Sequence, residues 1–287
     1  MGSNELRFFT DGAKKKIGFC SNSSRQMSEV YKRVNIKMPK PYVSICGVRT
    51  PDQAIGLRTL FDNQRYKSHL GALGFVTSTE SLAGEETHNF LTLPALYPLL
   101  KKSSAVNVIH HCSRKIEALC AEVAQVLNYQ EIYNQGLCRI VQLNNGLIEV
   151  AALQTIKEQF QGLDIVLSVD KQAMKNKNLI DEIDKRQQYL AYYLIDPSYG
   201  TGTPFDVWQC ADIYHRLAEQ FPNLIGGFAG GLSPETVVVV IEEIQKNRIH
   251  DFSLCVDTGV RGSNGCDLEK AEKYLINVNA ALRGPSN

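Results

Sequence analysis

The sequence predicts a (β/α)8 barrel, also called a TIM barrel, with an N-terminal extension. The first observation is a regular alternation of short apolar runs with amphipathic stretches of helical length, which indicates a parallel sheet with crossover helices. The second is that eight such runs occur, the number of strands that closes a barrel. The third is the length of 287 residues, which accommodates a barrel of about 250 residues and a further segment. An open, doubly wound sheet is the alternative for the same alternation.

Residues 1–40 form the predicted extension, and the barrel is expected over residues 41–287. The extension is polar, contains a serine-rich stretch at 21–26 and gives way to the barrel near Pro39 and Pro41. Its first residues are charged and lack an apolar core, so we expect no secretory signal. No run of 18 apolar residues occurs, so we expect no membrane span.

The predicted strands share one composition. Each is short and largely apolar, and most are rich in β-branched or aromatic residues, which is typical of parallel strands buried on both faces. They lie over residues 42–46, 70–76, 105–110, 138–143, 164–169, 190–195, 224–229 and 252–256.

Two helices between these strands have clear start signals. The helix predicted over 51–64 begins with Pro51 and Asp52. The helix predicted over 233–247 has Ser233 as its N-cap and Pro234 at its first helical position. The capping residues outweigh the four consecutive valines, which by themselves would fit a strand equally well.

Composition limits the class of protein. The formal net charge is +1, so no basic excess indicates a nucleic-acid partner. Together with the missing leader and membrane span, this predicts a cytoplasmic protein with neither nucleic acid nor membrane as a partner, either a monomer or a homodimer.

The eight cysteines are expected to be reduced thiols, because this chain is neither small nor cysteine-dense. No two of them form a C-x-x-C pair, so we expect no zinc site of that type. Several lie inside apolar runs such as 252–256, where a cysteine acts as a small hydrophobic residue.

Functional residues of such barrels lie at the C-terminal ends of the strands and in the loops that follow. Two of these loops favour a phosphate group. Gly230 and Gly231 allow close approach of backbone N–H groups, and the helix predicted to begin near Ser233 adds unpaired N–H groups. Thr258 and Gly259 follow the last strand, and the loops after strands seven and eight are the usual phosphate site of this fold. The alternative is that these glycines only form turns.

Cys46 and Asp196 end the first and sixth strands and are the candidate catalytic pair. A base and an acid on different sides of a barrel mouth can act on opposite ends of one substrate. Asp196 follows an apolar strand, and partial desolvation there favours its protonated form. The alternatives are that Cys46 only packs and that Asp196 accepts hydrogen bonds from its own loop at 200–202.

The same residues resemble the phosphoribosylanthranilate isomerase family over about 42–275. The resemblance lies in the order and spacing of motifs that are weak singly. These motifs are Ile45-Cys46-Gly47 with Pro51-Asp52, Gly74-Phe75-Val76, Val141-Gln142-Leu143, Asp196 with Gly200-Thr201-Gly202 and Phe205-Asp206, Ala229 through Glu235, and Gly259-Val260 ahead of Gly265-Cys266-Asp267.

The resemblance implies an isomerase of tryptophan biosynthesis that converts a phosphorylated aminoaldose into an aminoketose without a metal or cofactor. It implies that Cys46 removes the sugar C2 proton and that Asp196 protonates the ring oxygen. It also implies that Gly200, Thr201 and Gly202 contribute to binding.

The residues around this pair depart from the family pattern. Ser44 stands where the family has lysine, and Asn89 where the family has the arginine that binds the anthranilate carboxylate. Asn144 replaces a histidine after Gln142, and Asp257 replaces a serine beside the expected phosphate. The predicted substrate shell is therefore Arg49, Asn89, Gln142 and Asn144, with Arg49 as the candidate replacement cation.

Three functions fit the sequence. The first is an isomerase acting on a phosphorylated sugar amine. The second is a barrel that binds a phosphorylated ligand without catalysis and has a regulatory role, which the altered shell favours. The third is another phosphate-binding barrel enzyme such as an aldolase or epimerase, although no strand ends in an obvious Schiff-base lysine and only Lys171 lies just past the fifth strand.

Overall fold

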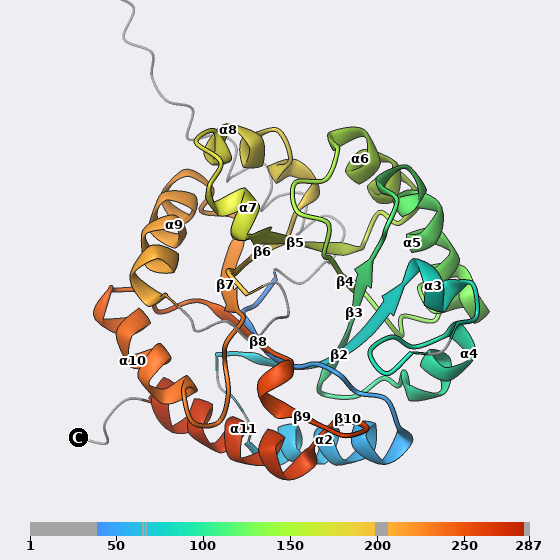
Figure 1. Ribbon diagram of the computed structural model, residues 1–287, viewed down its shortest axis with the longest axis horizontal. Coiled ribbons are helices and arrows are strands. Elements are labelled where there is room, and N and C mark those ends of the chain that lie inside the picture. The colour runs from blue at the N-terminus through green and yellow to red at the C-terminus, as the bar shows by residue number, and fades with distance from the viewer. Residues whose placement is uncertain (1–38, 65, 67, 86, 199–205, 284–287) are drawn as a thin grey trace, which may run out of the picture. The chain divides into compact units, whose positions relative to one another are not determined.

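The computed structural model describes residues 39–64, 66, 68–85, 87–198 and 206–283. In these residues eight parallel strands close a barrel in chain order, so the predicted fold class is confirmed (Figure 1). The strands are β1 (Tyr42–Ile45), β2 (Leu70–Ser78), β3 (Val106–Cys112), β4 (Ile140–Leu143), β5 (Asp164–Asp170), β6 (Tyr192–Asp196), β7 (Ile225–Ala229) and β8 (Ser253–Val256).

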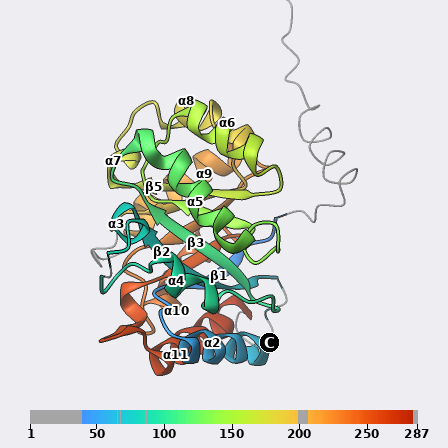
Figure 2. The same ribbon diagram turned by 90° about the vertical axis from the view of Figure 1, so that its right-hand side faces the viewer.

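Helices surround the barrel, as Figures 1 and 2 show from two directions. They are α2 (Pro51–Gln64), α3 (Thr79–Leu82), α4 (Leu93–Leu96), α5 (Leu119–Asn128), α6 (Val150–Gln159), α7 (Lys171–Met174), α8 (Leu179–Asp184), α9 (Val207–Gln220), α10 (Val237–Lys246) and α11 (Leu268–Arg283). After β8 come a short 3-10 helix, η5 (Thr258–Val260), and a two-stranded antiparallel ribbon of β9 (Arg261–Gly262) and β10 (Gly265–Cys266).

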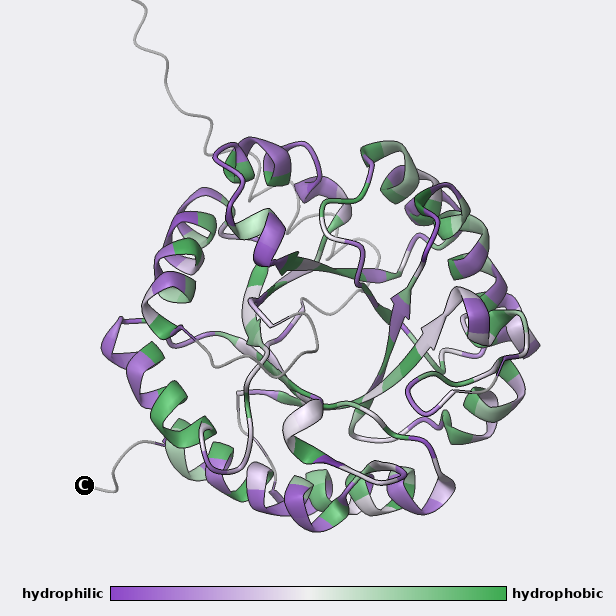
Figure 3. Cartoon of the chain, in the orientation of Figure 1, coloured by the Kyte–Doolittle hydropathy of each residue, from purple (hydrophilic) through white to green (hydrophobic). Residues whose placement is uncertain are grey.

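Alternate residues of each strand face the barrel interior and the helices. The larger core lies between strands and helices, where apolar side chains of both kinds of element pack. Figure 3 shows the corresponding pattern, with hydrophobic strands and helices that are hydrophilic on much of their outer surface. A smaller cluster fills the interior, where the ring of Tyr42 meets that of Tyr192 edge to face at 5.2 Å. The interior is therefore a packed core, and the carboxyl ends of the strands remain to hold a site.

One predicted helix begins later than expected. The helix α10 starts at Val237 and not directly after Ser233. The hydroxyl of Ser233 accepts from the backbone N–H groups of Glu235 and Thr236, at 3.2 and 3.3 Å. The carbonyl of Ser233 also accepts from the backbone N–H of Val237 at 3.0 Å, so this turn leads directly into α10. Ser233 therefore makes the capping contacts that the sequence predicted, although the helix proper begins four residues later.

The barrel belongs to a compact unit, Pro39–Asn287. The boundary predicted at residue 40 stays a prediction, because residues 1–38 lie outside the described part of the chain. In the described residues no helix has the length and apolar character that crossing a membrane requires.

Asp164, at the start of β5, offers a test of burial energetics. Burial raises the pKa of this carboxyl from 3.8 to about 6, against the opposing attraction of Lys157 and Arg139. The raised pKa means that folding favours the protonated form, so this contribution to stability is present below pH 3.8 and is lost as pH rises through about 6.

We therefore expect Asp164→Asn to raise the free energy of unfolding at pH 8 by about 1–2 kcal/mol. The upper limit is about 1.4 kcal/mol for each unit by which the pKa is raised. The expected gain is smaller than this limit because the side chain keeps some solvent contact. The gain should shrink toward zero as the pH is lowered to 4. Urea denaturation at both pH values measures it. A gain that is the same at both would contradict the assignment to ionisation.

Candidate functional site

A cavity of about 380 Å³ opens at the carboxyl ends of the strands. This is the face at which barrels of this kind hold their ligands, and the volume suits a small molecule. It is lined by Cys46, Val76, Asn89, Phe90, His110, Cys112, Gln142, Asn144, Ser168, Asp196, Ser198, Ala229, Gly230, Gly231, Leu232, Cys255, Val256, Asp257, Thr258 and Arg261.

Most of the residues predicted from the sequence meet here. The residues that line the cavity are the candidate pair and six of the predicted binding residues: Cys46, Asp196, Asn89, Gln142, Asn144, Gly230, Gly231 and Thr258. Gly259 and Arg49 are not among the lining residues. The side chain of Arg49 instead donates to the carbonyl of Phe90 at 3.5 Å. Gly200, Thr201 and Gly202 lie outside the described residues.

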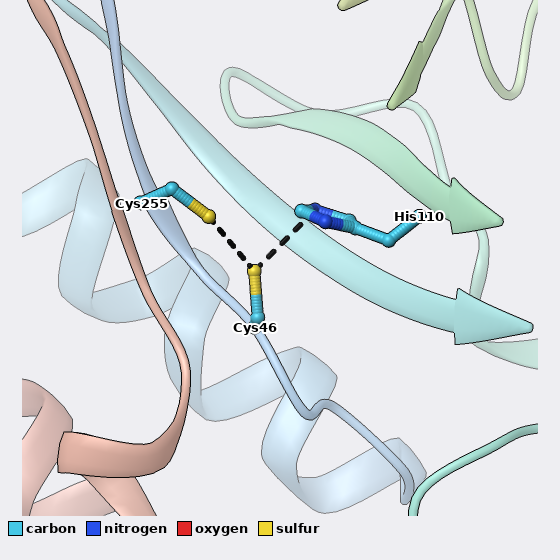
Figure 4. Close-up of side chains that lie close together, drawn as sticks. All are labelled: Cys46, His110 and Cys255. Carbon is cyan, nitrogen blue, oxygen red and sulfur yellow. Dashed lines mark hydrogen bonds between the residues drawn. The ribbon is translucent and has the colours of Figure 1, made fainter. Parts of the chain in front are cut away.

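Cys46 lies at the centre of a buried cluster that three strands build. It directly follows β1, and its Sγ is 3.4 Å from Nε2 of His110 in β3 and 3.3 Å from Sγ of Cys255 in β8. Figure 4 shows both side chains directed at the Cys46 sulfur. The hydroxyl of Ser44 is a third neighbour, 3.7 Å from the same sulfur. Cys46 is therefore a buried thiol with three polar partners.

These partners favour the thiolate of Cys46. The hydrogen bond from Cys255 lowers the pKa of Cys46 to about 6, with help from the nearby His110 and against burial. Burial lowers the pKa of His110, but its attraction and hydrogen bond to Cys46 outweigh this and raise it. The pKa of Cys255 is raised well above its usual value by its bond to Cys46 and by burial. The cluster thus favours an anionic Cys46, with the proton kept on Cys255 and with His110 stabilising the negative charge.

Gly74 explains how side chains from β1 and β3 can touch across the strand between them. A Cβ at this position of β2 would lie 2.4 Å from Sγ of Cys46 and 2.9 Å from Nε2 of His110. Any side chain there would separate the pair, so the absence of one creates the space in which the thiol and the imidazole meet.

Asp196, the last residue of β6, faces the cavity from another part of the ring. Its Oδ1 accepts from the backbone N–H and the hydroxyl of Ser198, at 3.0 and 2.9 Å. Gly230 approaches the same carboxylate from β7. Its φ is +83°, and a Cβ there would lie 2.5 Å from Oδ1 of Asp196. The loops after β6 and β7 therefore hold the carboxylate in place.

Gln142 presents an unused acceptor to the cavity. Its Nε2 donates to Oδ1 of Asn144 at 2.8 Å, whereas its buried Oε1 has no hydrogen-bond partner among the described residues. A buried polar atom without a partner costs free energy. A ligand with a hydroxyl or N–H group at this level of the cavity would satisfy it.

The guanidinium of Arg261 pairs with Asp257 and offsets the repulsion that this carboxylate would exert on a phosphate. Nε and Nη2 of Arg261 donate to the two carboxylate oxygens at 2.6 and 2.7 Å, a bidentate pair. Nη1 of Arg261 also donates to Oδ1 of Asn89. The altered residues Asn89 and Asp257 are thus parts of one polar group, with Arg261 between them.

Gly259 has a packing role that the sequence did not reveal, and its predicted contact with a phosphate stays a prediction. A Cβ there would lie 2.0 Å from the carbonyl oxygen of Leu232 and 2.8 Å from Cα of Ser233. Gly259 therefore permits the loop after β8 to pack against the loop after β7. This contact places Gly231 and Thr258 on the same cavity.

Sequence reasoning missed two of the site residues, His110 and Cys255, whereas Arg261 was expected as a possible partner that compensates Asp257. Cys255 was assigned with the cysteines of apolar runs, and the structure corrects this, since its sulfur contacts Cys46 in the cavity. The alternation of side chains along a strand was the available signal. In β8 it puts Ser253 and Cys255 on one face and Leu254 and Val256 on the other.

These features define a (β/α)8-barrel protein whose ligand cavity lies at the carboxyl ends of the strands. No family model matches the chain. The N-(5'-phosphoribosyl)anthranilate isomerase of Petrotoga mobilis is 25% identical over 212 residues, which are 72% of this chain and 84% of that protein. The resemblance seen in the motifs is thereby confirmed: the chain is similar, at low identity, to a phosphoribosylanthranilate isomerase.

Solved structures agree on the fold. A phosphoribosylanthranilate isomerase from Thermotoga maritima superposes with a TM-score of 0.56 at 16% identity, over 83% of this chain and 98% of that one. A Rubisco-like protein from Rhodopseudomonas palustris has a TM-score of 0.50 at 11% identity, over 91% of this chain and 69% of that one. Because proteins with different names share this barrel, the fold does not by itself define a substrate.

Proposed function

We propose that the protein is an isomerase that performs an Amadori rearrangement on a phosphorylated aminoaldose, as phosphoribosylanthranilate isomerase does in tryptophan biosynthesis. The observation that carries the proposal is that Cys46 and Asp196 line one cavity. They extend from β1 and β6, which are three strands apart around the ring. A small sugar phosphate between them would present different atoms to the two side chains.

In the proposed reaction Asp196 donates a proton to the ring oxygen while the bond between this oxygen and C1 breaks. The thiolate of Cys46 removes the proton from C2, which gives an enolamine. The enolamine becomes the aminoketose when C1 gains a proton and the C2 hydroxyl loses one. Substrate and product have the same composition, so no external oxidant or reductant is needed. His110 and Cys255 support this role, because both stabilise the thiolate.

The phosphate is proposed to bind beside Gly231 and Thr258. The loops after β7 and β8 meet here, and η5 is the short additional helix that often completes the phosphate site of this fold. Asp257 would repel a phosphate, but its bidentate pair with Arg261 offsets the charge. The unpaired Oε1 of Gln142 is available to a substrate hydroxyl or N–H group.

Arg261 is a better candidate than Arg49 for binding the carboxylate of an anthranilate group. It lines the cavity and contacts Asn89, which stands where the related family has its arginine. We expect Arg261→Gln to raise KM by about 10- to 100-fold, the loss for a charge-assisted contact, with a smaller change in kcat. Steady-state kinetics measure both. Arg49→Gln is the matched control, and a larger effect of that control would reverse the assignment.

The direct test supplies the purified protein with phosphoribosylanthranilate and follows the loss of its fluorescence. Turnover supports the isomerase. A folded protein that binds the substrate or its product analogue but does not turn it over would support the alternative, a phosphate-ligand-binding barrel without catalysis. The neutral Asn89 and Asn144 in the substrate shell favour this second function.

A further inference from the structure

We propose that Cys46, His110 and Cys255 form a site for one Zn²⁺ ion with a coordination position open to the cavity. All three are buried, and their donor atoms Sγ, Nε2 and Sγ lie within 4.8 Å of one another. Two thiolates and an imidazole are the donor types that Zn²⁺ prefers, and this set of three is found in catalytic zinc sites that keep a fourth position for water or substrate.

The spacing of the donors fits a tetrahedral ion. Ligands about 2.0–2.3 Å from a tetrahedral zinc lie about 3.4–3.8 Å apart. The Cys46 sulfur is 3.4 Å from Nε2 of His110 and 3.3 Å from the Cys255 sulfur. The third pair, Nε2 of His110 and the Cys255 sulfur, lies within 4.8 Å. An ion therefore fits among the three atoms once that pair closes by at most about 1 Å.

The barrel builds the site from strands that are distant in the sequence. Figure 4 shows the three side chains converging from separate segments of backbone. Gly74 leaves open the space in which Cys46 and His110 approach each other, since a Cβ there would overlap the sulfur. All three residues also line the cavity, so an ion bound to them would have one side facing it. The sequence predicted no metal because it contains no C-x-x-C pair; here β1, β3 and β8 supply one donor each.

Zinc binding and the proposed isomerisation exclude each other, a consequence that rests on the proposed function. A Cys46 sulfur bound to zinc cannot accept the C2 proton. The metal-free protein is the isomerase, and zinc is its inhibitor. The binding itself needs no catalytic activity, so the two proposals can fail separately.

The test uses the full chain, freed of metal with a chelator and kept reduced. Co²⁺ is added as a spectroscopic probe, and Zn²⁺ affinity is measured by competition with a chromophoric chelator. We expect one ion per chain and a near-ultraviolet thiolate-to-cobalt charge-transfer band. Cys255→Ser and His110→Ala should each weaken zinc binding by more than about 100-fold. Replacing a residue that only hydrogen-bonds to a metal ligand already lowers metal affinity by about 10- to 100-fold, and these two residues are ligands themselves.

Cys112→Ser is the matched control, since this cysteine lines the same cavity outside the cluster, and it should retain both the affinity and the band. Substoichiometric binding, a cobalt spectrum without a thiolate band, or unchanged affinity in Cys255→Ser would each overturn the proposal. The cobalt spectrum of the unaltered chain needs no variant to fold. Zinc binding without isomerase activity in the metal-free protein would refute the proposed function alone, and activity without zinc binding would refute this inference alone.

Discussion

Replacing Cys46 by alanine should reduce kcat for phosphoribosylanthranilate by at least about 10²–10⁴-fold, the usual contribution of a general base. The physical reason is that no other group takes the position of this sulfur: His110 and Cys255 are directed at it and hold its charge. Asp196→Asn should cause a loss of similar size, because an amide occupies the same place but cannot supply the proton. Single-turnover and steady-state assays of both variants measure these losses.

Cys120→Ser is the matched control for the loss at Cys46. Cys120 is a half-buried cysteine of α5 whose Sγ donates to the carbonyl of Ala152, and it is not among the cavity-lining residues. We expect its kinetics to match those of the parent. If Cys46→Ala folds and keeps the parental kcat, Cys46 is not the base, and the proposed mechanism fails at its first step.

The second large effect is expected from Gly259→Ala, which should abolish phosphate binding. It should also lower the free energy of unfolding by about 1–3 kcal/mol, the usual cost of an overpacked contact. The added Cβ would lie 2.0 Å from the carbonyl oxygen of Leu232, and neither atom belongs to a flexible side chain that could move aside. The loops after β7 and β8 must then separate, which moves Gly231 and Thr258 apart. Calorimetry with phosphate and urea denaturation measure the two effects.

Gly262→Ala is the control for this variant, because it makes the same substitution three residues further along the chain. A Cβ at Gly262 would meet its nearest neighbour, Cβ of Asp267, at an ordinary 3.4 Å. We expect unchanged phosphate affinity and a stability change within about 0.5 kcal/mol, as is usual at exposed positions. Unaltered phosphate binding by Gly259→Ala would show that the junction of these two loops is not the phosphate site.

The barrel, and the face of it that carries the cavity, could be predicted from the amino-acid sequence. Buried parallel strands must be apolar on both faces, so all eight could be located as apolar runs, from Tyr42 in the first to Val256 in the last. Polar residues that end such runs are forced to the carboxyl face of the barrel. For this reason Cys46, Asp196 and Gln142 could be identified in advance as residues of one site.

The neighbours of these residues could not be predicted, because they come from distant parts of the chain. His110 follows Cys46 by 64 residues and Cys255 follows it by 209 residues. Only closure of the barrel brings β8 beside β1. The contact of Arg261 with Asn89 likewise joins loops that are 172 residues apart in the chain. The role of Gly259 was hidden for the same reason, since a glycine needed for close packing and one needed for a ligand look alike in sequence. Strand composition reflects burial, which is local, whereas the charge state of a thiol depends on neighbours that the closed barrel supplies.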